Sequence, residues 1–319
     1  MDNTMLLHFP HGIHAFDSGY GRPMLDAIHL IEDSGQVAIV DTASNACVPR
    51  ILEALAELGR GVEDVAYVLL THIHLDHAGG AGGLMRHLPA ARLVVHPRGA
   101  RHMADPGKLW AGTVAVYGEA QARSLYGELL PVPAERIIEA VDGLSLTLGE
   151  RTIEVFDTPG HARHHVCYHD HRARAFFTGD TFGLSYRELD VGERQSIWPT
   201  TTPVQFDPAA MHASIDRMMA CRPEAMYLTH FSRLTDLERH ASDLHRLIDA
   251  HVAVAEAAEG EGEDLERNIE RGLTELLHSE AARQGWTLPK AQLLAVMAMD
   301  VELSAQGLAV WLGTREAVS

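Results

Sequence analysis

The sequence predicts a layered α/β (α+β) fold followed by an all-helical C-terminal segment. Short runs rich in β-branched residues alternate with amphipathic helical stretches up to about residue 235, and this alternation is typical of layered α/β architectures. Beyond Thr235 the β signal disappears, and apolar side chains recur at helical spacing. With 319 residues, of which 46% are hydrophobic, the chain can bury the core of one large domain with an appendage.

The N-terminal part is expected to form three short strands separated by turn-forming residues, at 12–17, 27–33 and 36–43. A helix should follow over 48–59, because Pro49 suits its first turn and Gly59 can end it. The strand "VAYVLLTH" then leads into a glycine-rich helix start, and another strand is expected at 92–97. Residues 98–135 are mixed in character, and we expect either a helical insertion near a pocket or an ordinary packed helical pair.

A second β-rich half runs from "RIIEAV" to "AFFTGD", and a strand at 225–231 closes it. Between them a helix is expected over 207–220, since Asp207 is a good N-cap and Pro208 suits the first helical position. We therefore expect one domain over 1–234 and a helical extension over 235–319, which would assist dimerisation or shape the pocket.

The charge balance narrows the partners of this chain. A formal net charge of −18 disfavours contact with nucleic acid or with an anionic membrane surface. The three cysteines show no CxxC spacing, so we expect reduced thiols. The N-terminus lacks the pattern of a signal peptide, and no apolar run approaches the roughly 18 residues of a membrane span. These features favour a soluble, cytoplasmic protein with a small-molecule substrate.

Histidine is unusually frequent, with 21 copies, and eight of them bunch at 72–77 and 161–171. The stretch "THIHLDHAGG" (71–80) follows an apolar run that looks like a buried strand. Side chains two apart in an extended stretch point to the same side, so His72 and His74 can bind one ion together. Where the chain begins to turn, Asp76 and His77 point elsewhere and can hold a second ion. Imidazole and carboxylate suit zinc, and also iron or manganese.

Further ligands are expected at the ends of other strands. Three candidates follow apolar strand-like runs: His161 in "DTPGH", Asp180 in "FFTGD" and His230 in "YLTHF". Each of them taken singly could be an ordinary polar residue at a strand end. Together with the stretch 71–80, these three segments indicate a metal site at one edge of the sheets.

This ordered set of HxHxDH, TPGH, TGD and a late histidine resembles the metallo-β-lactamase superfamily over roughly residues 10–235. The resemblance implies an αββα sandwich, and it makes Asp41 in "VDTA" mostly a structural position. It also implies two metal positions, formed by His72, His74 and His161 for the first and by Asp76, His77 and His230 for the second, with Asp180 bridging both. A hydroxide shared by two divalent ions would attack an acyl carbon, and Asp76 would orient it or accept its proton.

Other residues near these motifs have weaker assignments. His165 matches a second histidine of thioesterase-like relatives and is expected to orient a ligand. Tyr186, six residues past Asp180, is a candidate donor to a substrate carbonyl or else a packing residue. No role maps to three remaining histidines, which we expect to be exposed or in loops: His164, His169 and His171.

The ligand identities also narrow the reaction. Family members that cleave β-lactams commonly place cysteine where Asp180 stands, diiron reductases place glutamate where His74 stands, and nucleases need a basic substrate path. The remaining branch is similar to hydroxyacylglutathione hydrolase (glyoxalase II) and to acyl-homoserine lactonases, although the C-terminal part does not match a glutathione-binding segment. We therefore expect a hydrolase of a thioester, lactone or other ester with two divalent ions, most simply zinc. The alternatives are a mononuclear-iron persulfide dioxygenase and a non-catalytic metal-binding scaffold.

Overall fold

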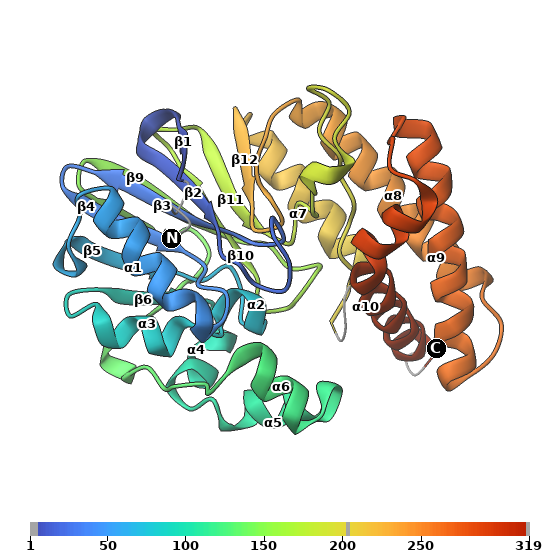
Figure 1. The fold of residues 1–319 in the computed structure, drawn as a ribbon, viewed down its shortest axis with the longest axis horizontal. Coiled ribbons are helices and arrows are strands. Elements are labelled where there is room, and N and C mark those ends of the chain that lie inside the picture. The colour runs from blue at the N-terminus through green and yellow to red at the C-terminus, as the bar shows by residue number, and fades with distance from the viewer. Residues whose placement is uncertain (1–5, 202–204, 317–319) are drawn as a thin grey trace. The chain divides into compact units, whose positions relative to one another are not determined.

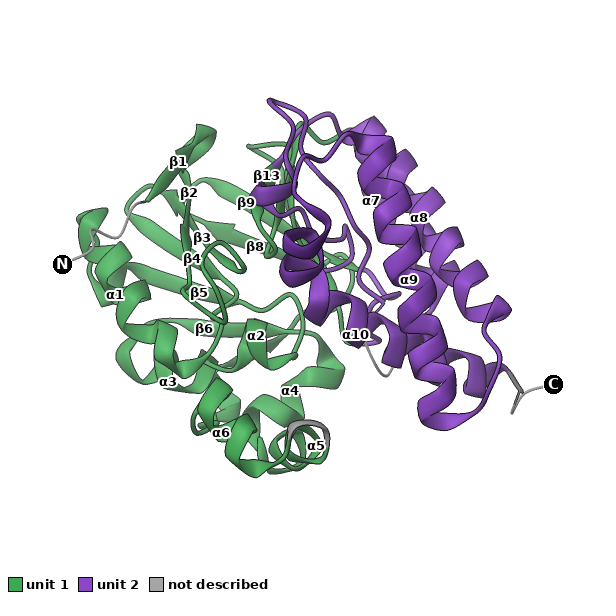
Figure 2. Cartoon of the chain, turned by 45° about the vertical axis from the view of Figure 1, so that its right-hand side comes forward, with its two compact units in different colours: residues 1–157, 164–179, 223–233 green, residues 158–163, 180–222, 234–319 purple. Residues whose placement is uncertain are grey.

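A computed structural model describes residues 6–201 and 205–316, which form two compact units (Figure 2). The first unit comprises Met1–Asp157, His164–Gly179 and Pro223–Arg233, so far as these are described. The second comprises Thr158–Arg163, Asp180–Arg222 and Leu234–Ser319, within the same limits. The chain passes between the units several times, so they do not coincide with the expected division at residue 234.

The first unit contains a seven-stranded sheet in which neighbours in the sequence are neighbours in space. Its strands, in spatial order, are β1 (Leu7–Phe9), β2 (Ile13–Asp17), β3 (Ala27–Asp33), β4 (Gln36–Val40), β5 (Val65–Leu69), β6 (Arg92–Val95) and β7 (Ile137–Glu139). The pairs from β1 to β4 are antiparallel, and those from β4 to β7 are parallel. Parallel neighbours need crossover connections, which explains why helices appear in the sequence only after β4.

A second sheet has six strands in the order β13-β12-β11-β10-β9-β8. These strands are β8 (Ser145–Leu148), β9 (Arg151–Asp157), β10 (Val166–Asp170), β11 (Ala175–Gly179), β12 (Ala225–Leu228) and β13 (Ser232–Leu234). The pairs from β8 to β11 are antiparallel, whereas β11 and β12 are parallel. All of this sheet lies in the first unit except its last residue, Leu234.

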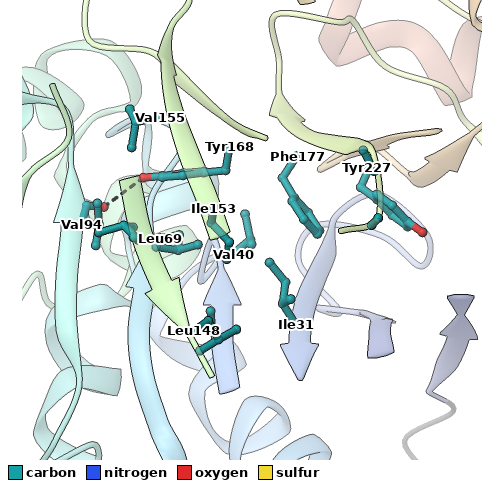
Figure 3. Packing of buried hydrophobic residues seen from close by; sticks show 14 of the residues in the cluster. Ile31, Val40, Leu69, Val94, Leu148, Ile153, Val155, Tyr168, Phe177 and Tyr227 are labelled. Carbon is teal, nitrogen blue, oxygen red and sulfur yellow. Dashed lines mark hydrogen bonds between the residues drawn. The ribbon is translucent and has the colours of Figure 1, made fainter. Parts of the chain in front are cut away.

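The hydrophobic core of the first unit lies between the two sheets (Figure 3). The first sheet contributes Ile31, Val40, Leu69 and Val94, and the second contributes Leu148, Ile153, Val155, Tyr168, Phe177 and Tyr227. Burying one large apolar side chain contributes roughly 1.5–3 kcal/mol, so this cluster dominates the stability of the sandwich. The Tyr168 hydroxyl is 2.7 Å from the Leu70 carbonyl oxygen and 3.2 Å from that of Val94, so its polar atom is satisfied inside the core.

Helices of the first unit connect the strands of the first sheet. They are α1 (Val48–Glu57), α2 (Leu75–Ala78), α3 (Ala81–His87), α4 (Pro97–Ala104), α5 (Gly107–Tyr117) and α6 (Glu119–Tyr126). In Figure 1, α1 and α3 lie over one face of this sheet. The segment 98–135 contains most of α4 and all of α5 and α6, and its place near a pocket stays a prediction. Five short 3₁₀ helices occur among the described residues, at Pro10–Gly12, Asn45–Cys47, Val62–Asp64, Ala134–Arg136 and Arg187–Leu189.

The second unit is mainly helical. Its helices are α7 (Pro208–Ala220), α8 (Leu237–Ala257), α9 (Gly262–Gln284) and α10 (Lys290–Glu316). The Asp207 side chain accepts a hydrogen bond from the Ala210 backbone N–H at 3.0 Å, which confirms the predicted N-cap of α7. Buried side chains repeat at helical spacing in the last three helices, including Leu244, Leu247 and Ile248, then Ile269, Leu273 and Leu277, then Met297, Val301 and Leu308.

Helix α10 differs from the sequence-based expectation in one respect. Residues Lys290–Arg315 are long and apolar enough to cross a membrane, judged by length and composition alone. No uninterrupted apolar run occurs there, because Asp300 and Glu302 divide it, but the mean hydropathy over 18 residues is high. Helix α10 packs against α8 and α9, and 39% of this apolar window is buried.

Candidate metal centre

Two histidines lie side by side where the chain leaves β5. His72 is buried and His74 is half-buried, and His72 Nε2 lies 2.9 Å from His74 Nδ1. The Thr71 hydroxyl donates its proton to the Asp41 carboxylate, so it accepts a hydrogen bond from His72 Nδ1 at 3.2 Å. His72 Nε2 therefore carries no proton and faces His74. Two imidazole nitrogens at this spacing can bind one ion with bonds of about 2.0–2.1 Å.

A second group of donors forms beside the first pair. Asp76 and His77 lie in the first turn of α2, and His230 follows β12. Asp76 Oδ2 is 3.7 Å from His77 Nε2 and 3.8 Å from His230 Nε2. One ligand atom from each of the three residues lies within 4.8 Å of the others, so this trio can hold a divalent ion.

Buried aspartates orient both histidines of this trio. His77 Nδ1 is 2.8 Å from Asp41 Oδ2, and His230 Nδ1 is 2.8 Å from Asp26 Oδ1. A carboxylate at Nδ1 favours the tautomer that carries its proton there, which leaves Nε2 as the nitrogen that binds. Both Nε2 atoms face Asp76. Paired carboxylate and imidazole groups of this kind are typical of metal sites, so these residues fit a divalent metal ion.

Asp41 connects the ends of several elements. Its carboxylate accepts hydrogen bonds from the Thr71 backbone N–H, the Thr71 hydroxyl and the Thr229 hydroxyl, each at 2.9 Å, in addition to His77. The residue has φ of +58°, which is unfavourable for a residue with a Cβ and is kept only where the surroundings impose it. This arrangement agrees with the structural role that the sequence suggests for Asp41.

Asp26 was not foreseen from the sequence. It stands directly before β3 and is buried, and burial raises the pKa of its carboxyl to about 6, while the adjacent His230 opposes that shift. A single aspartate beside an apolar strand forms no motif, so only its pairing with His230 across the fold reveals its role.

His165 lies against the first histidine pair. It is buried, and its ring stacks on that of His72 with centroids 4.8 Å apart. Gly179 makes room for this contact, because a Cβ there would lie 2.6 Å from both His165 Nε2 and Thr71 Oγ1. Its φ of +47° also favours glycine. The expected orienting role of His165 stays a prediction.

His164 lies in the turn that precedes β10, so it is the loop histidine that the sequence suggests. It is only partly exposed, and its ring centroid is 5.5 Å from that of His74. Burial, together with the charge of His74, lowers the pKa of His164 to about 3, so the ring is neutral near pH 7.

The other predicted site residues belong to the second unit. His161 and Asp180 are both buried there, with His161 Nε2 3.4 Å from Asp180 Oδ2. The Thr200 hydroxyl donates to the Asp180 carbonyl oxygen at 3.1 Å and therefore accepts from His161 Nδ1 at 3.0 Å. This bond turns Nε2 toward the carboxylate. Gly160 is required beside them, because a Cβ would lie 2.4 Å from the Met211 Cα.

Tyr186 is also in the second unit. It is fully buried, and its hydroxyl lies 3.1 and 3.2 Å from the two carboxylate oxygens of Asp300 in α10. The hydroxyl therefore donates to this carboxylate, and the expected contact with a substrate stays a prediction.

The sequence and the fold of this chain are similar to those of known proteins. The sequence pattern of the metallo-beta-lactamase superfamily matches residues 25–230. Hydroxyacylglutathione hydrolase from Aeromonas hydrophila subsp. hydrophila is 28% identical over 212 residues, which cover 66% of this chain and 63% of that protein. The match thus spans less than two thirds of the relative's length.

Two solved structures share the fold at 19% identity each. A metallo-beta-lactamase family protein from Thermus thermophilus has a TM-score of 0.67, and the alignment covers 96% of this chain and 94% of that one. An archaeal superfamily protein from Sulfolobus tokodaii has a TM-score of 0.61, with 93% and 98% covered. These matches confirm the predicted fold together with its C-terminal helical region. The chain therefore belongs to the metallo-β-lactamase superfamily.

Proposed function

We propose that this protein is a metal-dependent hydrolase that cleaves a thioester, a lactone or another ester. The observation that carries the proposal is the pair of buried contacts from Asp41 to His77 and from Asp26 to His230. These contacts turn the Nε2 atoms of His77 and His230 toward Asp76. Carboxylates orient the metal-binding histidines of metal sites in the same way.

The proposed centre would hold two ions: His72, His74 and His161 would bind one, Asp76, His77 and His230 would bind the other, and Asp180 would be shared. Chain connectivity supports the place of Asp180. Asp180 directly follows Gly179, and Gly179 lies against Thr71. Thr71 directly precedes the proposed ligand His72. The His161 imidazole lies 3.4 Å from the Asp180 carboxylate, so the two residues would reach the centre together.

Two divalent ions, most simply zinc, would supply an activated water and would polarise the acyl carbonyl oxygen. The residues of this chain would orient the water and hold the ligands in place. Asp76 has a side chain 28% exposed, so its carboxylate could orient the attacking water or accept its proton. His165 would keep the His72 ring in place by stacking on it.

The relative from Aeromonas supports a thioester as the first substrate class to test, because its name describes a hydrolase of an acylated glutathione. The formal net charge of −18 supports a small-molecule substrate and argues against nucleic acid. We propose a cytoplasmic location, because the three cysteines show no disulfide framework.

The test is metal analysis of the protein both as purified and after loading with zinc, together with a panel of thioesters and lactones. We expect two ions per chain that depend on the ligands of this centre, and hydrolysis of at least one class. A single iron per chain with oxygen consumption on a persulfide would replace this proposal by the dioxygenase alternative. Bound metal without any turnover across the panel would favour the non-catalytic scaffold.

A further inference from the structure

We propose that Glu154, His169 and His171 form a separate binding site for a divalent transition-metal ion such as zinc. The three residues lie on β9, on β10 and directly after β10, all in the first unit. None of them belongs to the motifs of the candidate metal centre.

The strand pairing places these side chains on one face of the second sheet. Glu154 lies directly opposite His169 in the antiparallel pair of β9 and β10, so their side chains are neighbours on the same face. The core-facing residues Ile153 and Val155 flank Glu154, so this face points away from the core. His171 is two residues beyond His169, and its backbone N–H donates to the Thr152 carbonyl at 3.2 Å, which continues the pairing.

The donor atoms converge as a metal site requires. His171 Nε2 lies 2.8 Å from Glu154 Oε2, and the rings of His169 and His171 have centroids 4.4 Å apart. One ligand atom from each of the three residues lies within 4.8 Å of the others. Two imidazoles and one carboxylate form a common ligand set for zinc. The Glu154 and His171 side chains are 29% and 47% exposed, so they can rotate to close the site.

His169 provides a second, independent observation. The sequence suggested an exposed or loop histidine, but His169 lies within β10 and is only 8% exposed, with its ring stacked 4.3 Å from that of Phe176. Its Nδ1 is buried and has no hydrogen-bond partner among the residues that the structure describes. Buried polar atoms are rarely left without a partner. A bound ligand would provide one for this ring nitrogen.

The protonation state of His169 also suits a cation. Burial and the neighbouring His171 lower the pKa of His169, so its ring is neutral near pH 7, and the neutral imidazole is the form that binds metal.

The site is distinct from the candidate metal centre. His165, which stacks on His72, precedes the first residue of β10, whereas His169 is four residues further along the strand. At about 3.3 Å per residue this separation is roughly 13 Å. An ion held by Glu154, His169 and His171 would therefore tie β9 to the end of β10 and stabilise this hairpin without touching the proposed reacting groups.

The experiment compares full-length wild type with His171→Ala and Glu154→Gln, both at partly exposed positions. His87→Ala is the matched control, since His87 is an exposed histidine at the end of α3. Each protein is stripped with a chelator, reloaded with zinc and analysed for ions per chain and zinc affinity. Circular dichroism checks the fold.

We expect each test variant to bind one ion fewer than the control, or to bind that ion at least about tenfold more weakly, with ester hydrolysis unchanged. The zinc-dependent rise in Tm should also be smaller in both. Equal ion counts and affinities in test variants and control would overturn the proposal, because the extra zinc would then be an adventitious ion only. The comparison does not depend on the proposed function, since it counts ions whether or not the protein hydrolyses any ester.

Discussion

His77 Nδ1 lies 2.8 Å from Asp41 Oδ2, and both side chains are buried. The contact joins α2 to the residue that follows β4, and the two Thr71 groups and the Thr229 hydroxyl fix the same carboxylate. These three hydrogen bonds fix the Asp41 carboxylate, and the carboxylate in turn orients His77, a candidate metal ligand.

Replacing Asp41 should weaken metal binding without changing any proposed ligand. In Asp41→Asn one oxygen becomes an NH₂ group, which cannot accept from His77 or from the threonines, so the imidazole loses its fixed tautomer. We expect zinc affinity to fall roughly 10–100-fold, as measured by competition with a chelator. Thr229→Val removes only one donor to this carboxylate and should have a smaller effect. Unchanged affinity in Asp41→Asn would show that the contact does not orient the ligand.

Asp180→Asn tests the proposed shared ligand. The change keeps the shape of the side chain but removes the formal charge that would hold two cations close together. We expect loss or weak binding of the second ion and a fall in turnover of at least about a hundredfold, with an intact fold. Asp249→Asn is the matched control, because the Asp249 side chain is 75% exposed in α8. If Asp180→Asn bound as many ions as the control and kept near-normal turnover, the bridging assignment would be refuted.

His251 should make the protein sensitive to acid. It is fully buried beside Trp198, and burial lowers its pKa to about 4, although its Nδ1–H donates to the Leu247 carbonyl at 2.7 Å. The unfolded chain takes up a proton near pH 6.5 and the folded chain only near pH 4, so stability is lost as pH falls through this window. Between about pH 7.5 and about pH 5 the loss from this residue should be about 2 kcal/mol.

The measurement is urea unfolding at both pH values for wild type and His251→Leu. The variant lacks the titrating ring, so its free energy of unfolding should depend less on pH than that of the wild type. An equal pH dependence in both proteins would exclude His251 as the cause.

A chain that ends at residue 234 should be unstable or aggregate. Without the C-terminal helices α7 loses its packing against α8, Trp198 loses His251, and the Tyr186 hydroxyl loses Asp300. Newly exposed apolar surface of this kind promotes association. Light scattering and thermal melting of the truncated and full-length proteins provide the test, and light scattering also reports whether the full chain forms a homodimer. A truncated protein that stayed monodisperse, stable and equally selective would contradict this prediction.

The sequence by itself was sufficient to predict most local features of the fold. The predicted strand at 27–33 is β3, the helix predicted over 48–59 is α1 (Val48–Glu57), and Asp207 caps α7. These features depend on periodicity and end signals within a dozen residues, which a single sequence displays directly. The same holds for His72 and His74, because side chains two apart in an extended stretch must lie on the same side.

The tertiary structure decided the contacts that depend on which strands become neighbours. Asp26 meets His230 although 204 positions separate them in the chain, and Glu154 meets His169 only because β9 and β10 pair in that register. A shift of one residue would turn Glu154 to the other face of the sheet. Register and strand order follow from the packing of the whole core, so no local pattern could reveal Asp26 as the partner of His230 or the proposed site at Glu154, His169 and His171.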